Sequence, residues 1–305
     1  MGGIRIFRID GLQAKEIKGS SVALEKSLQL YMEKNLEQLL GVTFLASEYT
    51  TGKTHAGRID TLGIDENGSP VIIEYKRAIN ENVINQGLYY LDWLLDHKAE
   101  FELLYLKITG KRADDIIDWS GPRLLCIAGD FTKYDLHAVQ QINRNVELIR
   151  YQQFEKSLLL LQLVNVTSQN VVEKNTSPQP TGKKGSARRT FSESLEISNT
   201  DLKDRYESLK AFAMALGDDV QVKTTKFYAA FRRIKNFTTV EVFPPSNQML
   251  LYLRLNPDEI TLEEGFTRDL RNIGHLGTGD LEIVIRSDED LERAKPLIIK
   301  SYEEN

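Results

Sequence analysis

The first part of the chain alternates between helical and strand-like patterns of apolar residues. Apolar positions from Val22 to Leu39 recur near helical spacing and predict an amphipathic helix over 21–40, whereas the runs 57–64 and 70–76 predict strands. Asn67-Gly68 between those strands is a strong tight-turn signal, so we expect a hairpin. The other predicted elements here are a strand at 4–9, a helix from about 81 to 97 or beyond, strands at 123–128, 147–151 and 158–166, and a helix at 136–143.

This order of elements predicts an α/β domain over 1–167, in which a mixed sheet is flanked by helices. Segment 168–194 is rich in Ser, Thr, Asn, Pro, Gly, Lys and Arg, and it predicts a flexible linker whose basic residues are either simply solvated or tether nucleic acid. A second, smaller α+β domain is predicted over 195–305. Its predicted elements are a helix at 202–216, strands at 227–231, 239–243, 249–255 and 281–286, and a closing helix at 291–302.

Composition narrows the class of protein. With 305 residues, 41% hydrophobic and 27% charged, the chain can bury a sizeable core. Its longest apolar run, 157–164, is too short to span a bilayer, and its start lacks the apolar region of a signal peptide, so we expect a cytoplasmic protein without a membrane partner. The single cysteine, Cys126, lies in an apolar run and predicts a buried side chain, which excludes an internal disulfide and a cysteine-based zinc site.

One face of the predicted strand 70–76 is polar. Residues alternate between faces along a strand, so Glu74 and Lys76 project to the same side. The register set by the Asn67-Gly68 turn can place Asp60 of the partner strand opposite Glu74. Two carboxylates beside an ammonium suit a magnesium ion at a phosphodiester, since Mg²⁺ prefers oxygen ligands and the lysine can orient water or stabilise developing charge. The alternative is a cross-strand ion pair on a solvated face.

The next predicted helix adds Gln86 and Tyr90, which are four residues apart and therefore share a face. An amide there can hold a water or a phosphate oxygen, and a phenol can buttress it; ordinary helix-face residues are the alternative. The net charge of −5 gives no global attraction to a polyanion, so contact with nucleic acid needs a local basic surface or bridging metal ions. Residues that could supply such a surface, or that are only scattered surface cations, are Lys53, His55, Arg58 and Arg77.

Residues 24–107 resemble the PD-(D/E)xK nuclease superfamily, and within it the C-terminal nuclease domain of NucS-type mismatch-directed endonucleases. The resemblance implies a restriction-endonuclease-like fold, Mg²⁺ or Mn²⁺ as cofactor, metal ligands Glu25, Asp60 and Glu74, a catalytic Lys76 and an assisting Gln86. Glu33 and Glu37 compete with Glu25. Tyr75 replaces the usual leucine of the family, and the preceding DNA-binding domain is missing, so mismatch specificity is not implied. The matching motifs are Glu25-x-x-Leu28 with Asn35, Gly57-Arg58-Ile59-Asp60, Val71-Ile72-Ile73-Glu74-Tyr75-Lys76-Arg77 and Gln86-Gly87-Leu88-Tyr89-Tyr90.

From about residue 195, the chain resembles an uncharacterised domain family found behind such nuclease-like domains, in proteins sometimes labelled predicted transport proteins. The match rests on Phe231-Arg232-x-x-Lys235, Phe237, 249–253 and the glycine-rich segment 274–280. The lack of an apolar run long enough for a membrane contradicts transport. His275 in that segment is either a ligand contact or a structural residue.

The function predicted from the sequence is a metal-dependent nuclease, with DNA as the favoured substrate and endonucleolytic cleavage as the favoured reaction. A catalytically silent nucleic-acid-binding or regulatory protein that keeps the fold is the alternative from another class, and an RNase is the third. The expected partners are DNA, a second copy of the chain in a homodimer, and a protein bound by the C-terminal domain.

Overall fold

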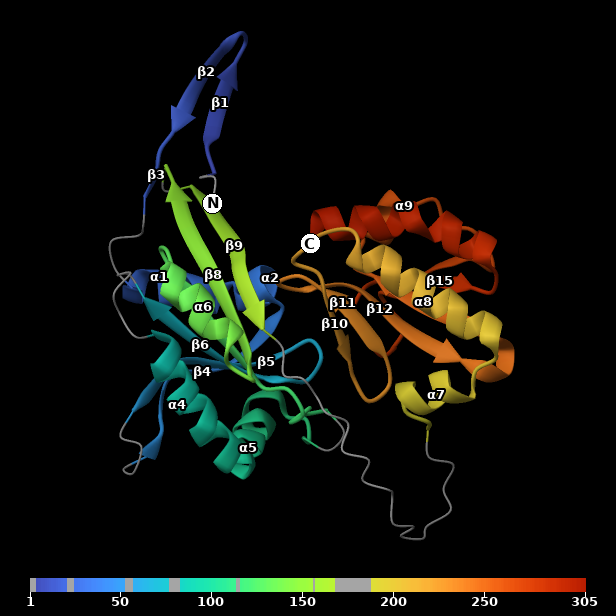
Figure 1. The fold of residues 1–305 in the computed structure, drawn as a ribbon, viewed down its shortest axis with the longest axis horizontal. Helices are drawn as coiled ribbons and strands as arrows, with labels where there is room; N and C mark the ends of the chain where they lie inside the picture. The colour runs from blue at the N-terminus through green and yellow to red at the C-terminus, as the bar shows by residue number, and fades with distance from the viewer. Residues whose placement is uncertain are drawn as a thin grey trace. The chain divides into compact units, whose positions relative to one another are not determined.

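The computed structural model of the chain describes residues 4–20, 25–52, 57–76, 83–113, 116–155, 157–167 and 188–305. It forms two compact units, Met1–Asn170 and Val171–Asn305 (Figure 1). Among the described residues, no helix combines the length and the apolar character needed to cross a membrane.

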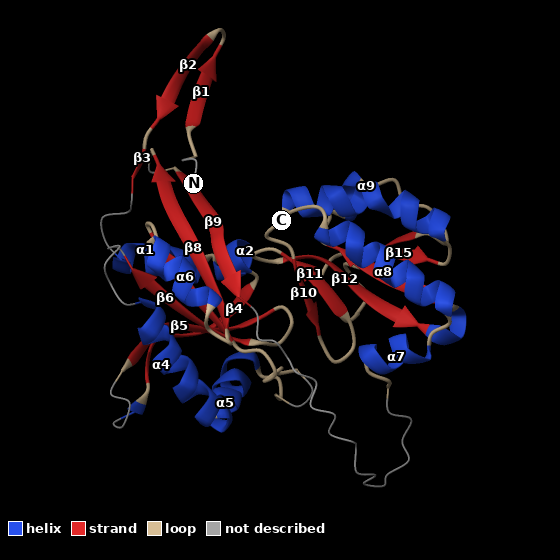
Figure 2. Cartoon of the chain, in the orientation of Figure 1, coloured by secondary structure: helices blue, strands red, loops and turns tan. Residues whose placement is uncertain are grey.

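The first unit is built on a mixed sheet with the strand order β3-β8-β7-β6-β5-β4, and β9 pairs with β8. Strands β6, β7 and β8 run parallel to one another and the remaining pairs are antiparallel, so the predicted mixed α/β sheet is confirmed (Figure 2). A separate hairpin of β1 and β2 precedes it. The strands are β1 (Ile6–Asp10), β2 (Gln13–Ile17), β3 (Gly19–Ser20), β4 (Val42–Thr50), β5 (Arg58–Asp65), β6 (Pro70–Lys76), β7 (Arg123–Ala128), β8 (Asn145–Phe154) and β9 (Leu158–Thr167).

Helices cover both faces of this sheet. Leu62 and Ile72, on one face, share a core cluster with residues of α4. Gly87 of α4 lies so close to the sheet that an added Cβ would stand 2.4 Å from Leu124, which explains a glycine in mid-helix. Thr61, on the opposite face, contacts α1 through Glu33. The helices of this unit are α1 (Glu25–Lys34), α2 (Leu36–Leu40), α4 (Val83–Asp96), α5 (Lys98–Thr109) and α6 (Lys133–Gln140).

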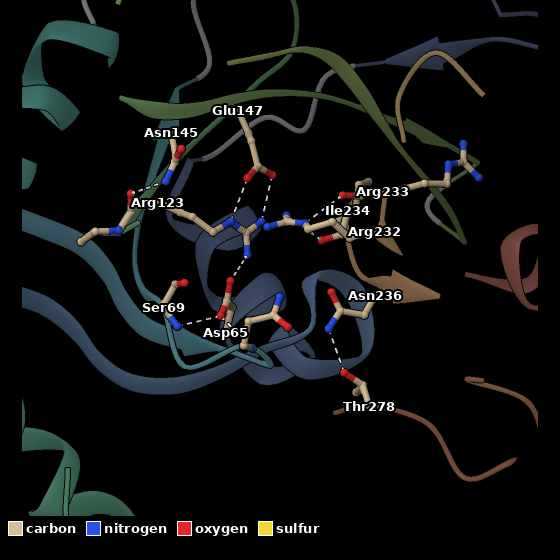
Figure 3. Close-up of polar contacts among 12 residues, drawn as sticks. Asp65, Ser69, Arg123, Asn145, Glu147, Arg232, Arg233, Ile234, Asn236 and Thr278 are labelled. Atoms are coloured by element: carbon tan, nitrogen blue, oxygen red, sulfur yellow. Dashed lines mark hydrogen bonds and ion pairs between the residues drawn. The ribbon is translucent and has the colours of Figure 1, made fainter. Parts of the chain in front are cut away.

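A buried charge cluster fixes the turn end of the β5–β6 hairpin (Figure 3). Arg123, at the start of β7, donates to both oxygens of Glu147 at 2.8 and 2.9 Å and to Asp65 at 2.8 Å. Asp65 in turn accepts from the backbone N–H groups of Asn67 and Ser69. The predicted Asn-Gly hairpin is therefore confirmed, and this cluster ties its turn to the two parallel strands β7 and β8.

Two departures from the sequence pattern have local causes. The single helix predicted over 21–40 is wrong, because the chain breaks into α1 and α2 at Asn35, whose side-chain amide donates to the Tyr31 carbonyl and so competes with the helix ladder. Residues 21–24 of that prediction lie outside the described ones. The missed strand β4 contains a bulge between Phe44 and Ala46, which shifts the two-residue alternation on which the prediction relied.

Other differences concern element ends. Helix α6 starts at Lys133 rather than near 136, because Thr132 and Asp135 form a capping box. Helix α4 ends at Asp96, and after His97 a separate helix α5 follows. Cys126 is fully buried in β7, as predicted.

The second unit is an antiparallel sheet covered by helices, which agrees with the predicted smaller α+β domain. Its sheet has the order β10-β11-β12-β13-β15-β14. The predicted linker 168–194 extends too far, because α7 begins at Phe191, which is buried in this core, and Thr190 caps it; residues 168–187 lie outside the described ones. The elements are α7 (Phe191–Ile197), α8 (Thr200–Met214), β10 (Gln221–Thr224), β11 (Ala229–Arg232), β12 (Asn236–Phe243), η1 (Pro244–Ser246), β13 (Gln248–Leu253), η2 (Pro257–Glu259), β14 (Thr267–Asp269), β15 (Leu281–Ile285) and α9 (Asp288–Glu304).

Candidate functional site

The open end of the β5–β6 hairpin holds two carboxylates in contact with the facing strand. The Cα register of the two strands ends at Thr61 opposite Ile73. Beyond it, the Asp60 backbone N–H donates to Glu74 Oε1 at 3.2 Å, and the Tyr75 N–H donates to Asp60 Oδ2 at 3.0 Å. Side-chain carboxylates thus replace backbone carbonyls as acceptors where the ladder stops, and these bonds fix the two acidic groups side by side.

Glu74 is the electrostatically strained member of this pair. Its side chain is fully buried, and Oε2 has no hydrogen-bond partner among the described residues. Burial, and next the charge of Asp60, raise the pKa of Glu74 to about 9, against the opposing effects of the Asp60 N–H and Lys76. At neutral pH a cation beside both carboxylates would be needed to keep both ionised.

An open pocket of about 630 Å³, here called the carboxylate pocket, is lined by Asp60, whereas the buried Glu74 is not among its lining residues. Its lining combines acids, cations, amides and phenols from β4, β5, β6, α1 and α4, so a polar and charged ligand suits it better than an apolar one. Five predicted site residues meet there: Asp60, Lys76, Gln86, Tyr90 and Arg58.

Tyr90 joins helix α4 to the hairpin at this pocket. Its hydroxyl accepts from the Arg58 backbone N–H at 3.2 Å and from the Gln86 side-chain amide at 3.3 Å. Gly57 leaves room for the ring, because a Cβ at this position would stand 2.4 Å from Tyr90 Cε1. The phenol therefore sets the position of both the Gln86 amide and the first residues of β5.

Sequence reasoning missed several residues around the pair. Gln29 of α1 donates to the Asp60 carbonyl at 2.8 Å, so the helix fixes the backbone of the acidic residue. Glu48 of β4 forms an ion pair with Arg58, also lines the carboxylate pocket and further raises the pKa of Glu74. The bulge that concealed β4 also concealed Glu48; Gln29 carried a findable signal, since it follows Glu25 by one helical turn.

The remaining predicted site residues are placed only in part. Glu33, a competitor for the third carboxylate, accepts from Thr61 Oγ1 at 2.7 Å and from the pocket-lining Gln29 at 3.0 Å, but is not itself among the residues that line the pocket. Glu37 lies in α2. Lys53 and Arg77 lie outside the described residues, as does the side chain of Glu25. Within the ranges that the structure describes, His, Cys, Asp and Glu side chains form no group of three or more that could hold a metal ion.

Comparisons with known proteins bear on the two units differently. Residues 191–305 match the family model of a domain of unknown function (DUF5655), which confirms the resemblance of the C-terminal part to an uncharacterised domain and begins where α7 begins. An uncharacterized protein of Haemophilus influenzae is 29% identical over 310 residues, which cover 97% of this chain and 98% of that protein.

Two solved structures resemble part of the chain. One is a repair endonuclease from Pyrococcus abyssi, with a TM-score of 0.28, 18% identity and coverage of 41% of this chain and 45% of that one. The other is an EndoMS complex with double-stranded DNA, with a TM-score of 0.25, 18% identity and coverage of 43% and 47%. This chain thus spans less than half the length of either structure. These TM-scores are low, and the contacts within the site carry the functional argument.

Proposed function

We propose that the chain is a metal-dependent nuclease that hydrolyses phosphodiester bonds, with DNA as substrate and endonucleolytic cleavage as the reaction. The observation that carries the proposal is the pair Asp60 and Glu74: Asp60 lines a polar pocket, and the buried Glu74 beside it has a carboxylate oxygen with no partner among the described residues. A buried carboxylate that lacks a hydrogen-bond partner is typical of a functional site. In a purely structural role, each buried oxygen is expected to have a hydrogen-bond or ion-pair partner. The choice of DNA is supported by the PD-(D/E)xK-like motifs.

The donor set fits a hard divalent cation. Asp60 and Glu74 offer carboxylate oxygens, which Mg²⁺ and Mn²⁺ prefer, and Oε2 of Glu74, which has no partner among the described residues, can gain a ligand without breaking one of their hydrogen bonds. Glu25 is the sequence-derived candidate for a third ligand. When bound, such an ion would polarise a phosphate, lower the pKa of a water molecule and offset charge in an in-line displacement.

The chain's own side chains supply the other roles. Lys76 follows Glu74 by two residues on the same strand face and lines the carboxylate pocket, where its ammonium can orient a water or stabilise charge that develops on the phosphate. Gln86, positioned through Tyr90, can hold a water or a phosphate oxygen. Lys26 and Arg58 line the same pocket and can contact the nucleic-acid backbone, together with the sequence-derived candidates Lys53 and Arg77.

The experiment that tests this function is a cleavage assay of the full chain. Single-stranded, duplex and branched DNA and RNA are incubated with Mg²⁺, with Mn²⁺ and with chelator, using wild type and the variants Asp60→Asn, Glu74→Gln and Lys76→Met. We expect metal-dependent cleavage of DNA and a loss of at least about a hundredfold in each variant. Arg268→Met, an exposed position in the other unit, is the matched control and should leave cleavage unchanged.

Cleavage that persists in all three variants would end the proposal. Binding of nucleic acid without cleavage under any divalent metal would instead favour the catalytically silent module, and cleavage confined to RNA would identify an RNase.

A further inference from the structure

The hairpin of β1 and β2, residues Ile6–Ile17, is here called the arm. It forms a two-stranded sheet of its own and projects from the first unit (Figure 1). Only Ile17 at its base is buried, and the other residues of the two strands are exposed or, at Ile6, half-buried. A two-stranded hairpin in water is at best marginally stable, so an ordered arm of this kind indicates a surface that covers it.

The arm is apolar towards its tip, beyond Glu16, which lies opposite Phe7 and pairs with Arg5. Phe7 and Ile9 lie two residues apart on β1 and therefore share a face, to which β2 adds Ala14 opposite Ile9. Ile9 is 76% exposed, and Leu12 in the turn is fully exposed. Exposed apolar side chains gathered at a tip, here Ile9, Leu12 and Ala14, are typical of an interaction surface.

The pairing of the two arginines at the arm favours a protein partner over a polyanion, although Lys15 of β2 is exposed. Arg5, just before the arm, donates to both carboxylate oxygens of Glu16 at 2.9 and 3.0 Å. Arg8 is paired with Glu155 in the turn between β8 and β9. Both guanidinium groups are therefore already paired with carboxylates, which a nucleic-acid phosphate would have to displace.

The same unit carries a matching apolar pocket. About 200 Å³ of space lies between α1 and the β8–β9 turn, lined by Leu28, Tyr31, Leu158 and Leu159. The remaining lining residues are Ser27, Gln153 and Ser157, so among the described residues no charged side chain lines the space and no residue of the arm fills it. A pocket of this size and polarity suits an aliphatic side chain such as that of the arm's tip.

We propose that two copies of the chain exchange arms, each inserting Leu12 at the apolar tip of its arm into the apolar pocket of the other. Because the chain carries both the apolar tip and its pocket, reciprocal insertion gives a closed dimer with twofold symmetry. The proposal rests on the arm and the apolar pocket alone and is independent of the nuclease chemistry. It names the contact through which the expected homodimer forms.

The first test is the oligomeric state of the full chain, measured by analytical ultracentrifugation over a concentration series with neither metal nor nucleic acid present. We expect a dimer that Leu12→Asp at the tip and Ser157→Arg in the apolar pocket each weaken at least tenfold, as the loss of a buried apolar contact implies. Both positions are exposed in the single chain, so the variants should fold, which circular dichroism checks. Leu103→Asp on α5, also exposed, is the control and should leave the dimer intact.

The second test is disulfide trapping. The only natural cysteine, Cys126, is fully buried, so introduced cysteines have a clean background. Leu12→Cys protein mixed with Ser157→Cys protein should form a cross-linked heterodimer on mild oxidation, whereas Leu103→Cys mixed with Ser157→Cys should not.

Three results would overturn the proposal. The first is a monomer at every concentration, or a dimer that neither variant weakens. The second is a disulfide that forms within one chain carrying both Leu12→Cys and Ser157→Cys, which would mean that the arm folds back onto its own pocket. The third is an unchanged oligomeric state in Leu12→Asp together with lost DNA binding, which would assign the arm to nucleic acid.

Discussion

The two ends of the β5–β6 hairpin bury acidic groups in opposite ways. At the turn end, Glu147 and Asp65 surround Arg123; burial opposes its charge, yet the two carboxylates hold the pKa of the guanidinium above its usual value. At the open end, Glu74 and Asp60 lie together, and burial followed by the neighbouring charge raises the pKa of Glu74 to about 9. The turn end is thus called compensated, because opposite charges face one another there. The open end is called uncompensated, because two acidic groups lie together.

This difference in charge distinguishes a cluster that stabilises the fold from a candidate functional site. A buried charge is tolerated when an opposite charge and hydrogen bonds satisfy it, as around Arg123. At Glu74, by contrast, one buried carboxylate oxygen lacks a partner in the described residues, and its neighbour Asp60 lines an open polar pocket. The charge cluster at the turn end therefore stabilises the fold. At the open end the two acidic groups lie together, and a bound cation would stabilise them.

The largest expected effect tests the compensated end. Arg123→Met removes the buried guanidinium that donates to both Glu147 and Asp65, so we expect the free energy of unfolding to fall by about 3–5 kcal/mol. Urea denaturation followed by circular dichroism measures it. The matched control is Arg5→Met, which removes an exposed ion pair and should leave the midpoint unchanged. An equally small shift in Arg123→Met would remove the contrast between the two ends.

The second prediction concerns the uncompensated end. In metal-free protein, the raised pKa of Glu74 means that the folded state holds a proton which the unfolded state has lost between about pH 5 and 9. This contribution to stability is fully present below pH 4.5 and is lost as pH rises towards 9, at up to about 1.4 kcal/mol per pH unit. Glu74→Gln should therefore be more stable than wild type at pH 8 and lack this part of the pH dependence.

Melting temperatures of the two proteins from pH 5 to 9, recorded with chelator, measure the difference. Parallel curves for wild type and Glu74→Gln would show that Glu74 is already compensated.

A third prediction tests the fit between the hairpin and α4. Gly57→Ala places a Cβ 2.4 Å from Tyr90 Cε1, so the ring must move. We expect a loss of about 1–3 kcal/mol in unfolding free energy and reduced cleavage. Gly274→Ala is the matched control, since nothing lies within 4 Å of a Cβ there and its φ is outside the left-handed region. Cleavage equal to wild type in Gly57→Ala would exclude Tyr90 from the site.

The smallest effect is expected for Tyr90→Phe. This variant keeps the ring but removes the acceptor for the Arg58 N–H and the Gln86 amide, which costs about 1 kcal/mol in stability. Cleavage should fall less than in the double variant with Gln86→Ala, and the kinetics of single and double variants measure the coupling. Strictly additive effects would show that Tyr90 does not position Gln86.

The sequence predicted the parts of the site that depend on local rules. Strand alternation and the Asn-Gly turn brought Asp60, Glu74 and Lys76 to one end of a hairpin, and the structure joins Asp60 to Glu74 by a hydrogen bond. Their roles and the metal stay predictions. Non-local features escaped: Arg123 finds its partners 24 and 58 residues away, and no periodicity encodes such a pairing.

Local irregularities account for most of the other misses. The bulge in β4 broke the alternation that would have revealed Glu48, and Asn35 ended a helix whose apolar spacing continued past it. The polar stretch before Phe191 concealed a helix start, because a capping box and one buried aromatic are a weak signal beside a run of Ser, Pro, Gly and Lys.

The most direct test of the central claim, that the uncompensated end is a metal site, is anomalous diffraction from crystals of the chain soaked in Mn²⁺. We expect an anomalous peak bound by the carboxylates of Asp60 and Glu74, and its loss in crystals of Glu74→Gln soaked in the same way. Absence of a peak at these two residues in well-diffracting wild-type crystals, or a peak that survives in Glu74→Gln, would contradict it.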